Sequence, residues 1–301
     1  MSIIYQGTDI TELIDVQGAQ ATDCEGGRAD ELRLQLSDVA KMWDQWKPQR
    51  GDEIRLVENG YDSGIMYLDE ITSGPSECTL RAASINHTAR VESYQAWEGI
   101  TLRRLILDFA ARYGLTPDLF DVPDVSYQRI AQYGDYDMAW LSRRCMMEGC
   151  ALKIYDGRLV VYEQRKAEQG ASVATIELTN NTPYTYREVG HLARSGCVLE
   201  SGAVRGRFDA PDGTGPVMVV RDVAAGSIAE AKRYARGLLR EQNKRMVTLS
   251  VRQILDGVYA AGECVNVEGS VAADGIWFVS SVLYDFIGEM VALELRRPIP
   301  W

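Results

Sequence analysis

Apolar and polar residues alternate through residues 51–82, a pattern that predicts three short β-strands. In the first of these strands Ile54 and Leu56 alternate with Glu53 and Arg55. Glycine-containing turns separate the strands from one another. We therefore predict a β-meander here, and the rest of the chain is organised around it.

The same pattern recurs near the end of the chain. A shift of 211 positions, without a gap, matches Gly51 with Gly262, Ile54 with Val265, Leu56 with Val267, Gly64 with Gly275, Ile65 with Ile276, Leu68 with Val279, Ile71 with Val282, Leu80 with Val291 and Ala82 with Leu293. A preceding strand also repeats, at residues 32–36 and 247–251. Unrelated meanders can share such alternation, but a duplicated β-domain accounts for the sustained register. We expect residues 29–84 and 247–297 to superimpose as similar antiparallel meanders, within two barrels or sandwiches.

The region between the two meanders changes to a helical period. Residues 102–113 place apolar side chains on one face, with Thr101 as the predicted N-cap. A second helix is predicted for residues 137–148, followed by a hairpin that turns at Asp156-Gly157. These elements predict a compact helix–helix–hairpin unit.

The segment that follows this unit mixes polar stretches, strands and one long helix. Residues 164–172 are polar and suit a linker, and the Gly- and Pro-rich residues 206–220 predict a long loop. Ser227 and Glu230 have the spacing of a capping box at the start of a helix. One side of this helix is basic and is interpreted as a solvated face: Arg233, Arg236, Arg240 and Lys244.

Tryptophan is the residue type whose role the sequence leaves open. A short helix is predicted to carry Val39, Met42, Trp43 and Trp46 on one face, after an N-cap at Ser37 or Asp38. Core packing is the simplest role for these tryptophans and for Trp97 and Trp140. An exposed platform for a sugar or a partner is the alternative.

Composition then narrows the classes of function. The 301 residues are 46% hydrophobic and carry a formal charge of −11, which argues against a surface that binds nucleic acid. The first residues lack the features of a signal peptide, and no stretch has the length of a membrane span, so we expect synthesis in the cytoplasm and no membrane insertion. The six cysteines are scattered, and we expect them to be buried free thiols.

Motifs for catalysis are missing from the sequence. Neither a phosphate-binding glycine loop nor a GxSxG motif occurs. Cys145 and Cys150 have no histidine near them in sequence, since the two histidines are His87 and His191. Two carboxylate pairs have spacings that acid–base chemistry could use: Asp135 with Asp137, and Asp121 with Asp124. Caps are the better explanation for the first pair, and we expect no catalytic, cofactor-binding or metal-binding residues.

The order of these units resembles one family. The repeated meander, the helix at residues 102–115 and the helix–hairpin at residues 136–163 are together similar to the baseplate hub proteins of contractile phage tails and tailocins, the late-control protein D group. The same fold forms the head of type VI secretion spike proteins. The resemblance covers essentially the whole chain, and its order and spacing are more specific than any single motif.

This resemblance implies an α+β, mainly β fold: two tube-like antiparallel β-barrel domains with an inserted helix–helix–hairpin α/β unit. The expected domains are residues 1–88, 89–165 and 166–301. Three copies would form a pseudo-sixfold ring that joins the hexameric tail tube to the central spike. Since nothing follows the second barrel in this sequence, any spike or wall-degrading activity is expected on other chains.

The partners and location follow from the resemblance as well. The expected partners are further copies of the chain in a homotrimer, the tail tube protein, the central spike protein, other baseplate proteins and the tape-measure protein, with no specific nucleic-acid binding. The protein would lie in the baseplate of a virion tail or tailocin, after a cytoplasmic stage in the producing bacterium. No catalytic residues are implied, so we expect a structural protein and not an enzyme.

Two alternative functions remain open from the sequence, and the acidic charge leads to one further expectation. A carbohydrate- or receptor-binding tail-tip module would use the tryptophans as an exposed platform, and a cell-wall-degrading tail enzyme would need a carboxylate pair in a cleft. If the chain lines a channel, its acidic balance predicts carboxylates on the channel-facing side. Arg233, Arg236 and Arg240 would then lie on an outer helix.

Overall fold

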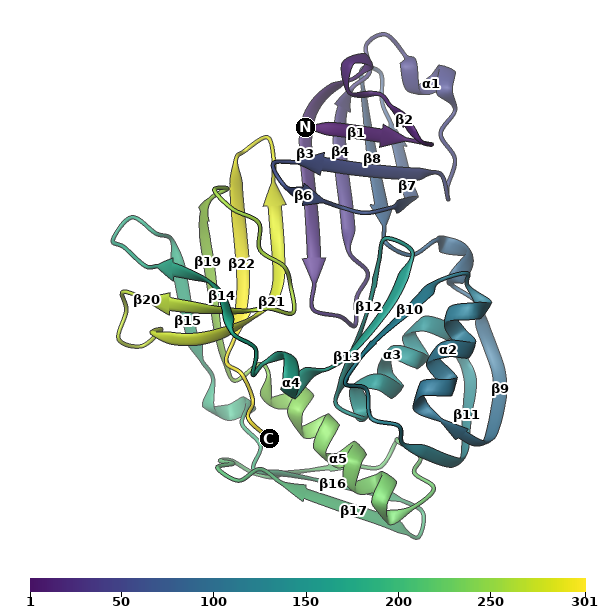
Figure 1. The fold of residues 1–301 in the computed structure, drawn as a ribbon, viewed down its shortest axis with the longest axis vertical. Coiled ribbons are helices and arrows are strands. Elements are labelled where there is room, and N and C mark those ends of the chain that lie inside the picture. Colours follow the sequence, from purple (N-terminus) through teal and green to yellow (C-terminus); the bar gives the residue numbers. More distant parts are fainter.

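A computed structural model describes residues 1–301, except for the side chain of Asp44. Two hydrophobic cores divide these residues. Figure 1 shows the strands and helices among which the cores lie. The first core lies among strands from both ends of the chain, and the second lies among helices and strands from its middle. The fold is therefore α+β and mainly β, as the sequence predicts.

The N-terminal half contains eight strands and one short helix. In chain order they are β1 (Ser2–Tyr5), β2 (Thr8–Asp9), β3 (Asp15–Cys24), β4 (Glu31–Ser37), α1 (Met42–Trp46), β5 (Glu53–Glu58), β6 (Tyr61–Asp62), β7 (Met66–Ser73) and β8 (Glu77–Ala83). Short 3-10 turns lie at Thr11–Leu13 and His87–Ala89. α1 begins later than predicted, and Val39 is exposed, but the Asp38 carboxylate accepts a hydrogen bond from the Trp43 backbone N–H at 3.2 Å.

The C-terminal half begins after the short helix α4 (Gln164–Ala167). Its own strands are β14 (Ser172–Glu177), β15 (Tyr184–Glu188), β19 (Val247–Ile254), β20 (Cys264–Glu268), β21 (Gly275–Asp285) and β22 (Met290–Arg296). Between β15 and β19 the chain forms a 3-10 turn (Gly190–Leu192), three strands and a helix: β16 (Gly196–Ser201), β17 (Val204–Asp209), β18 (Val217–Val220) and α5 (Ile228–Asn243). This insertion has no counterpart in the first half, where a direct turn joins β3 to β4.

The two halves have the same strand order, which confirms the predicted repeat. Neighbouring strands run β3-β4-β8-β7-β5-β1 in the first half and β15-β19-β22-β21-β20-β14 in the second. The correspondence extends beyond the meander that the sequence shows, to β1 with β14 and β3 with β15. Only the outermost pairing differs in direction, because β1 is antiparallel to β5 whereas β14 is parallel to β20.

The repeat extends to individual hydrogen bonds. The Gly51 N–H donates to the Leu68 carbonyl at 2.7 Å, and the Gly262 N–H donates to the Val279 carbonyl, 211 positions later, at 2.9 Å. The bulge that interrupts β7 between Leu68 and Glu70 recurs in β21 at the matching positions.

The ungapped register fails only in the last hairpin. Ile71 pairs with Leu80, whereas its counterpart Val282 pairs with Leu293, so the second turn is two residues longer. Leu80 therefore corresponds to Leu293, and the sequence-based match with Val291 was wrong by two positions.

The two halves join into one sheet, because β3 pairs with β21. The result is a 14-stranded sheet, and within the described residues its ladder stays open and does not close into a barrel. The two tube-like barrels that the resemblance implies are therefore not closed barrels within the single chain. Each half folds its sheet over itself, and apolar side chains from both halves fill the first core.

The middle of the chain forms the predicted α/β unit. Its elements are β9 (Glu92–Thr101), α2 (Leu102–Arg112), β10 (Thr116–Phe120), β11 (Ser126–Tyr136), α3 (Asp137–Met147), β12 (Cys150–Tyr155) and β13 (Arg158–Glu163). The Thr101 hydroxyl caps α2 by accepting from the Arg104 N–H at 3.2 Å, as predicted. Asp156 and Gly157 both have positive φ values, which the predicted type I′ turn requires.

The inserted segment between β15 and β19 belongs to the second core. Leu199 of β16 and Tyr234 and Leu239 of α5 are buried together with residues of α2 and α3. The Gly- and Pro-rich stretch predicted as a long loop instead supplies β17 and β18, which pair on either side of β16. This core therefore crosses the boundary expected at residue 166.

Close backbone contact holds α5 against both of its neighbours. A Cβ atom on Gly237 would lie 2.3 Å from the Met147 carbonyl oxygen at the end of α3, and a Cβ on Gly206 of β17 would lie 2.3 Å from the Ala231 carbonyl carbon in α5. Glycine at these two positions allows the helix to pack against its neighbours at backbone distance.

We predict that Gly237→Ala lowers the free energy of unfolding by about 1–3 kcal/mol, because the added methyl group clashes with backbone that cannot move independently. Alanine would otherwise stabilise a helix. Urea denaturation measures the change. Gly257→Ala is the matched control, since a Cβ atom at that position would have no other atom within 4 Å. Equal stability of the two variants would contradict close packing of α5 against α3.

Candidate assembly surface

The junction between the two halves is a short antiparallel ladder. It pairs Gln20–Cys24 of β3 with Ser281–Asp285 of β21. Two further hydrogen bonds extend it, from the Glu25 N–H to the Ser280 carbonyl and from the Phe286 N–H to the Ala19 carbonyl, both at 2.9 Å. A strand edge of each half is thereby covered by the other half.

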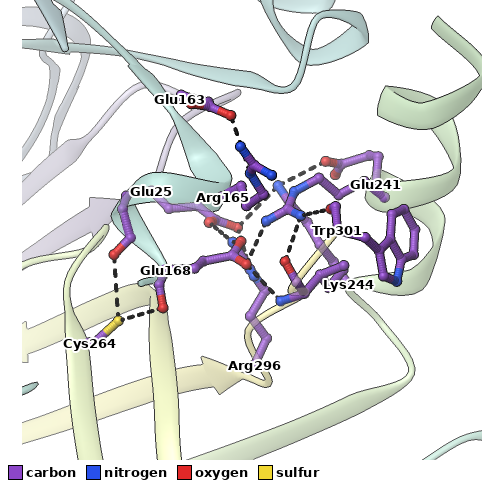
Figure 2. Close-up of polar contacts among 12 residues, drawn as sticks. Glu25, Glu163, Arg165, Glu168, Glu241, Lys244, Cys264, Arg296 and Trp301 are labelled. Carbon is purple, nitrogen blue, oxygen red and sulfur yellow. Dashed lines mark hydrogen bonds and ion pairs between the residues drawn. The ribbon is translucent and has the colours of Figure 1, made fainter. Parts of the chain in front are cut away.

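A largely buried group of charged side chains lies beside this junction, centred on Arg296 of β22 (Figure 2). Arg296 lies 2.8 Å from the Glu25 carboxylate, in the turn after β3, and 2.7 Å from the Glu168 carboxylate, which follows α4. Its guanidinium also stacks over the Phe278 ring at 4.4 Å. One side chain therefore connects the first half, the segment after the α/β unit and the second half.

Helix α5 contributes the remaining members of this group. Arg240 lies 2.5 Å from Glu168 and donates to the backbone carbonyls of Ile299 and Trp301 at 2.8 and 2.6 Å. Lys244 lies 3.5 Å from Glu25 and 2.9 Å from Glu241. Three acidic and three basic side chains make up this ion-pair network, so its formal charge is zero: Glu25, Glu168 and Glu241 with Arg240, Lys244 and Arg296.

The network shifts the ionisation of its members. Burial alone would raise the pKa of Glu25, but the positive charges of Lys244 and Arg296 hold it below its ordinary value. For Arg296, burial opposes the charge, yet Glu25 and Glu168 raise its pKa above the ordinary value. Both groups are therefore charged at neutral pH.

A second buried ion pair connects the α/β unit to the first half. The Lys153 ammonium of β12 contacts Asp23 of β3 and lies 3.3 Å from the Asp30 carboxylate before β4. Burial raises the pKa of Asp30 to about 7 and lowers that of Lys153 to about 8. The β3–β4 turn is thus held on one side by Lys153 and on the other by Arg296.

Two of the strand edges left uncovered within the described residues belong to β15 and β7, one strand from each half. β15 pairs with β19 on one side only. β7 pairs with β5 through Tyr67 and Met66 only, so its stretch from Ile71 to Ser73 has a free edge. These edges present unpaired backbone groups, which are templates for pairing with another strand.

An exposed aromatic cluster lies on the two-stranded sheet of β9 and β11. Tyr94 and Tyr133 are directly paired across the two strands and are 77% and 76% exposed, and Tyr136 is 50% exposed. Sequence reasoning missed this cluster because alternation marks which residues share a face, but not whether another element covers that face.

The tryptophans lie in the cores and not on a platform. Trp43 is buried against Tyr5 and Trp46, with ring centroids 5.5 and 5.0 Å away. Trp97 and Trp140 stack on each other at 5.0 Å in the second core. The structure thus supports the core-packing interpretation of these residues.

The basic side of α5 is not the solvated face that the sequence predicts. Arg233 lies 2.8 Å from the buried Glu148 carboxylate, and Arg240 is 3% exposed. Arg236 is half-buried, with its guanidinium 5.8 Å from the centre of the Phe208 ring. Sequence periodicity identified a charged face correctly but could not show that other charged residues lie against it.

The candidate catalytic residues are distributed over separate environments. Asp137 is buried and accepts from the Tyr113 hydroxyl and the Arg112 guanidinium, both at 2.6 Å, so it is not the helix cap that the sequence predicts. Asp135 pairs with Arg143, and Asp121 pairs with Lys166, both at 2.9 Å, while Asp124 is exposed.

The environments of the cysteines and histidines can be described in the same way. All six cysteines are buried, and none of them forms a disulfide. Burial raises the pKa of Cys145 to about 12, which keeps its thiol protonated. His87 and His191 lie in the 3-10 turns that follow β8 and β15. In the described part of the chain, no group of three or more His, Cys, Asp or Glu side chains could hold a metal ion.

Among solved structures, the chain resembles phage tail proteins over nearly its whole length. The tail protein of Neisseria meningitidis MC58 is 15% identical, with a TM-score of 0.77 over 100% of this chain and 96% of that one. The 43 kDa tail protein of prophage MuSo2 from Shewanella oneidensis is 14% identical, with a TM-score of 0.73 over 99% and 98%. The chain shares the fold of these tail proteins.

A type VI secretion component shows a weaker likeness. This Escherichia coli protein is 10% identical, with a TM-score of 0.61 over 96% of this chain and 74% of that one. No protein-family model and no curated protein matches the chain. Across the residues with described structure, no helix is both long and apolar enough to span a membrane.

We predict that Arg296→Met lowers the free energy of unfolding by about 3–5 kcal/mol, because it leaves the carboxylates of Glu25 and Glu168 buried without their shared partner. Chemical denaturation measures the loss. Arg81→Met is the control: Arg81 also lies between two carboxylates, Glu31 and Glu70, but is 45% exposed, so water screens the lost pairs. A loss no larger than that of the control would show that the network does not hold the halves together.

The lowered pKa of Glu25 predicts a specific dependence on pH. Below the ordinary glutamate value of 4.5, the unfolded chain takes up a proton that folded Glu25 resists, so the stabilising contribution is present above that value and is lost as pH falls. The difference in urea midpoint between the native chain and Glu25→Gln should therefore shrink between about pH 6 and pH 3. A difference that is constant over this range would contradict a charged Glu25 in the folded network.

Proposed function

We propose that this chain is the structural baseplate hub of a contractile tail, where three copies form a pseudo-sixfold ring between the hexameric tail tube and the central spike. The observation that carries the proposal is the repeat of a six-strand order within one chain. Three chains with two such halves each would supply six similar units. A sixfold tube requires that number at the surface where it meets the hub.

The likeness to tail proteins supports the same proposal. It spans nearly all of this chain and nearly all of the two tail proteins, so both halves and both cores are included in the match. The type VI secretion component extends the likeness to an injection machine related in architecture. In this proposal residues 1–88 and 166–301 supply the tube-like domains and residues 89–165 supply the inserted unit, against which residues 196–243 of the second domain pack.

The partners in this proposal are those of a ring within a larger assembly. They are two further copies of the chain, the tail tube protein, the central spike protein and neighbouring baseplate proteins, with the tape-measure protein inside the channel. The location is the tail baseplate of a virion or tailocin. The burial of Trp43 and Trp140 argues against the alternative of a sugar-binding platform made from the tryptophans.

Cryo-electron microscopy of intact tails tests the copy number. We expect three copies of the chain in one ring, on the tail axis between the tube and the spike, because only three two-unit chains reproduce sixfold symmetry. Native mass measurement of a baseplate subassembly provides an independent count. A ring of six chains, or a single copy per tail, would contradict the hub assignment.

A further inference from the structure

We propose that neighbouring copies of this chain join by strand pairing between β7 of one copy and β15 of the next, in a register that the internal β21–β3 junction already defines. This inference deepens the proposed hub function and rests on it. The partner strand at each of the two free edges comes from a second copy of the same chain.

The internal repeat relates the free edges of β7 and β15 to a pair of strands that is already joined. β21 corresponds to β7, and β3 corresponds to β15, in the common strand order. Inside the chain, the edge of β21 is covered by β3. The corresponding edges of β7 and β15 are both free within the described residues, one on each half. A single kind of contact can therefore occur once within each chain and once between chains.

The strand pairings within each half show which residues of β7 and β15 correspond to the paired residues of β21 and β3. The β5–β7 and β20–β21 pairings place β7 on β21 with the shift of 211. Because Leu80 corresponds to Leu293, the β4–β8 and β19–β22 pairings place Leu34 on Val251, two positions beyond the sequence-based match of residues 32–36 with 247–251. The β3–β4 and β15–β19 pairings then place residues 20–24 on residues 185–189. The internal pair of Leu283 with Thr22 then becomes Thr72 with Arg187 of the partner subunit. The neighbouring pairs are Ile71 with Glu188 and Ser73 with Tyr186.

The orientation of the backbone groups agrees independently with this register. Gly74 N–H donates to the Glu77 carbonyl, and Val189 N–H donates to the Met246 carbonyl, at 2.8 Å each. Because bonding direction alternates along antiparallel strands, Thr72 and Arg187 bond toward their own sheets. Ile71 and Ser73 in β7, and Tyr186 and Glu188 in β15, therefore direct their N–H and C=O groups outward, as the proposed pairs require.

Side-chain exposure and charge fit the same arrangement. Glu70, Thr72, Arg187 and Glu188 are exposed in the single chain. On the outward face of the joined sheet, the proposed register places Arg187 of one copy diagonally beside Glu70 of the next, which brings opposite charges together. The contact is head-to-tail, and repetition of such a contact closes a ring when the rotation between neighbouring copies is one third of a turn. The sheet that is open in one chain would then be continuous around three.

Engineered cysteines test the register in assembled tails. Thr72→Cys with Arg187→Cys occupies a pair that is not hydrogen-bonded, where the Cβ atoms of facing residues are closest. We expect oxidation to link the chains covalently into trimers, seen on a non-reducing gel, while each single variant stays a monomer. The six natural cysteines are buried and do not compete.

Two matched variants control the geometry. Thr22→Cys with Leu283→Cys occupies the corresponding pair inside the chain and should form an intrachain disulfide, which shows that this type of pair can be bridged. Thr72→Cys with Glu188→Cys is one residue out of register, so its side chains lie on opposite faces and should remain unlinked. Efficient linkage of this shifted pair would overturn the proposed register. The register would also be overturned if the internal control forms its disulfide but Thr72→Cys with Arg187→Cys does not link.

The density of unmodified tails provides a second and independent test. Strands β7 and β15 of adjacent copies should run antiparallel side by side at the spacing of one sheet, about 4.8 Å. A three-copy ring with these edges apart would refute the strand pairing and leave the hub function standing. A copy number other than three would refute the hub function itself.

Discussion

The pairing of β3 with β21 is the contact on which the rest of this structure depends. It joins residues from the two ends of the chain, such as Gln20 and Asp285, and converts two similar half-sheets into one sheet. Backbone groups at a strand edge must find partners when they are covered, and here each half satisfies the edge of the other. The relative orientation of the two halves is therefore set by the geometry of a β-ladder and not by a flexible linker.

The ion-pair network around Arg296 reinforces that junction. Charges removed from water are costly, and the attraction within such a group contributes little net stability compared with apolar side chains of similar shape. Loss of one member is nonetheless severe, because it leaves an opposite charge buried. The network thus mainly destabilises arrangements in which these segments are wrongly placed. Glu25, Glu168 and Arg240 come from three different segments, and all three must be in position for each charge to have a partner.

The second core adds a further connection between segments that are distant in sequence. Helix α5 is inserted between two strands of the C-terminal half, yet it packs against α3 of the middle unit through Gly237. Its basic side reaches Glu148 in one direction and Glu168 in the other. The α/β unit is consequently held by packing and by ion pairs to both halves, with Lys153 providing the contact to the first.

The sequence by itself determined the features that depend on near neighbours. Alternation located the meander strands, helical spacing located α2, α3 and α5, and Asp156-Gly157 located a hairpin, because these signals arise from residues a few positions apart. The ungapped repeat revealed the duplication, although it missed the two extra residues in the last turn. The tertiary structure alone decided that β3 pairs with β21, that residues 196–243 complete the core of the middle unit, and that Arg240 is buried. These outcomes depend on contacts between surfaces that are more than a hundred residues apart in sequence. Local periodicity does not show which element covers a given face.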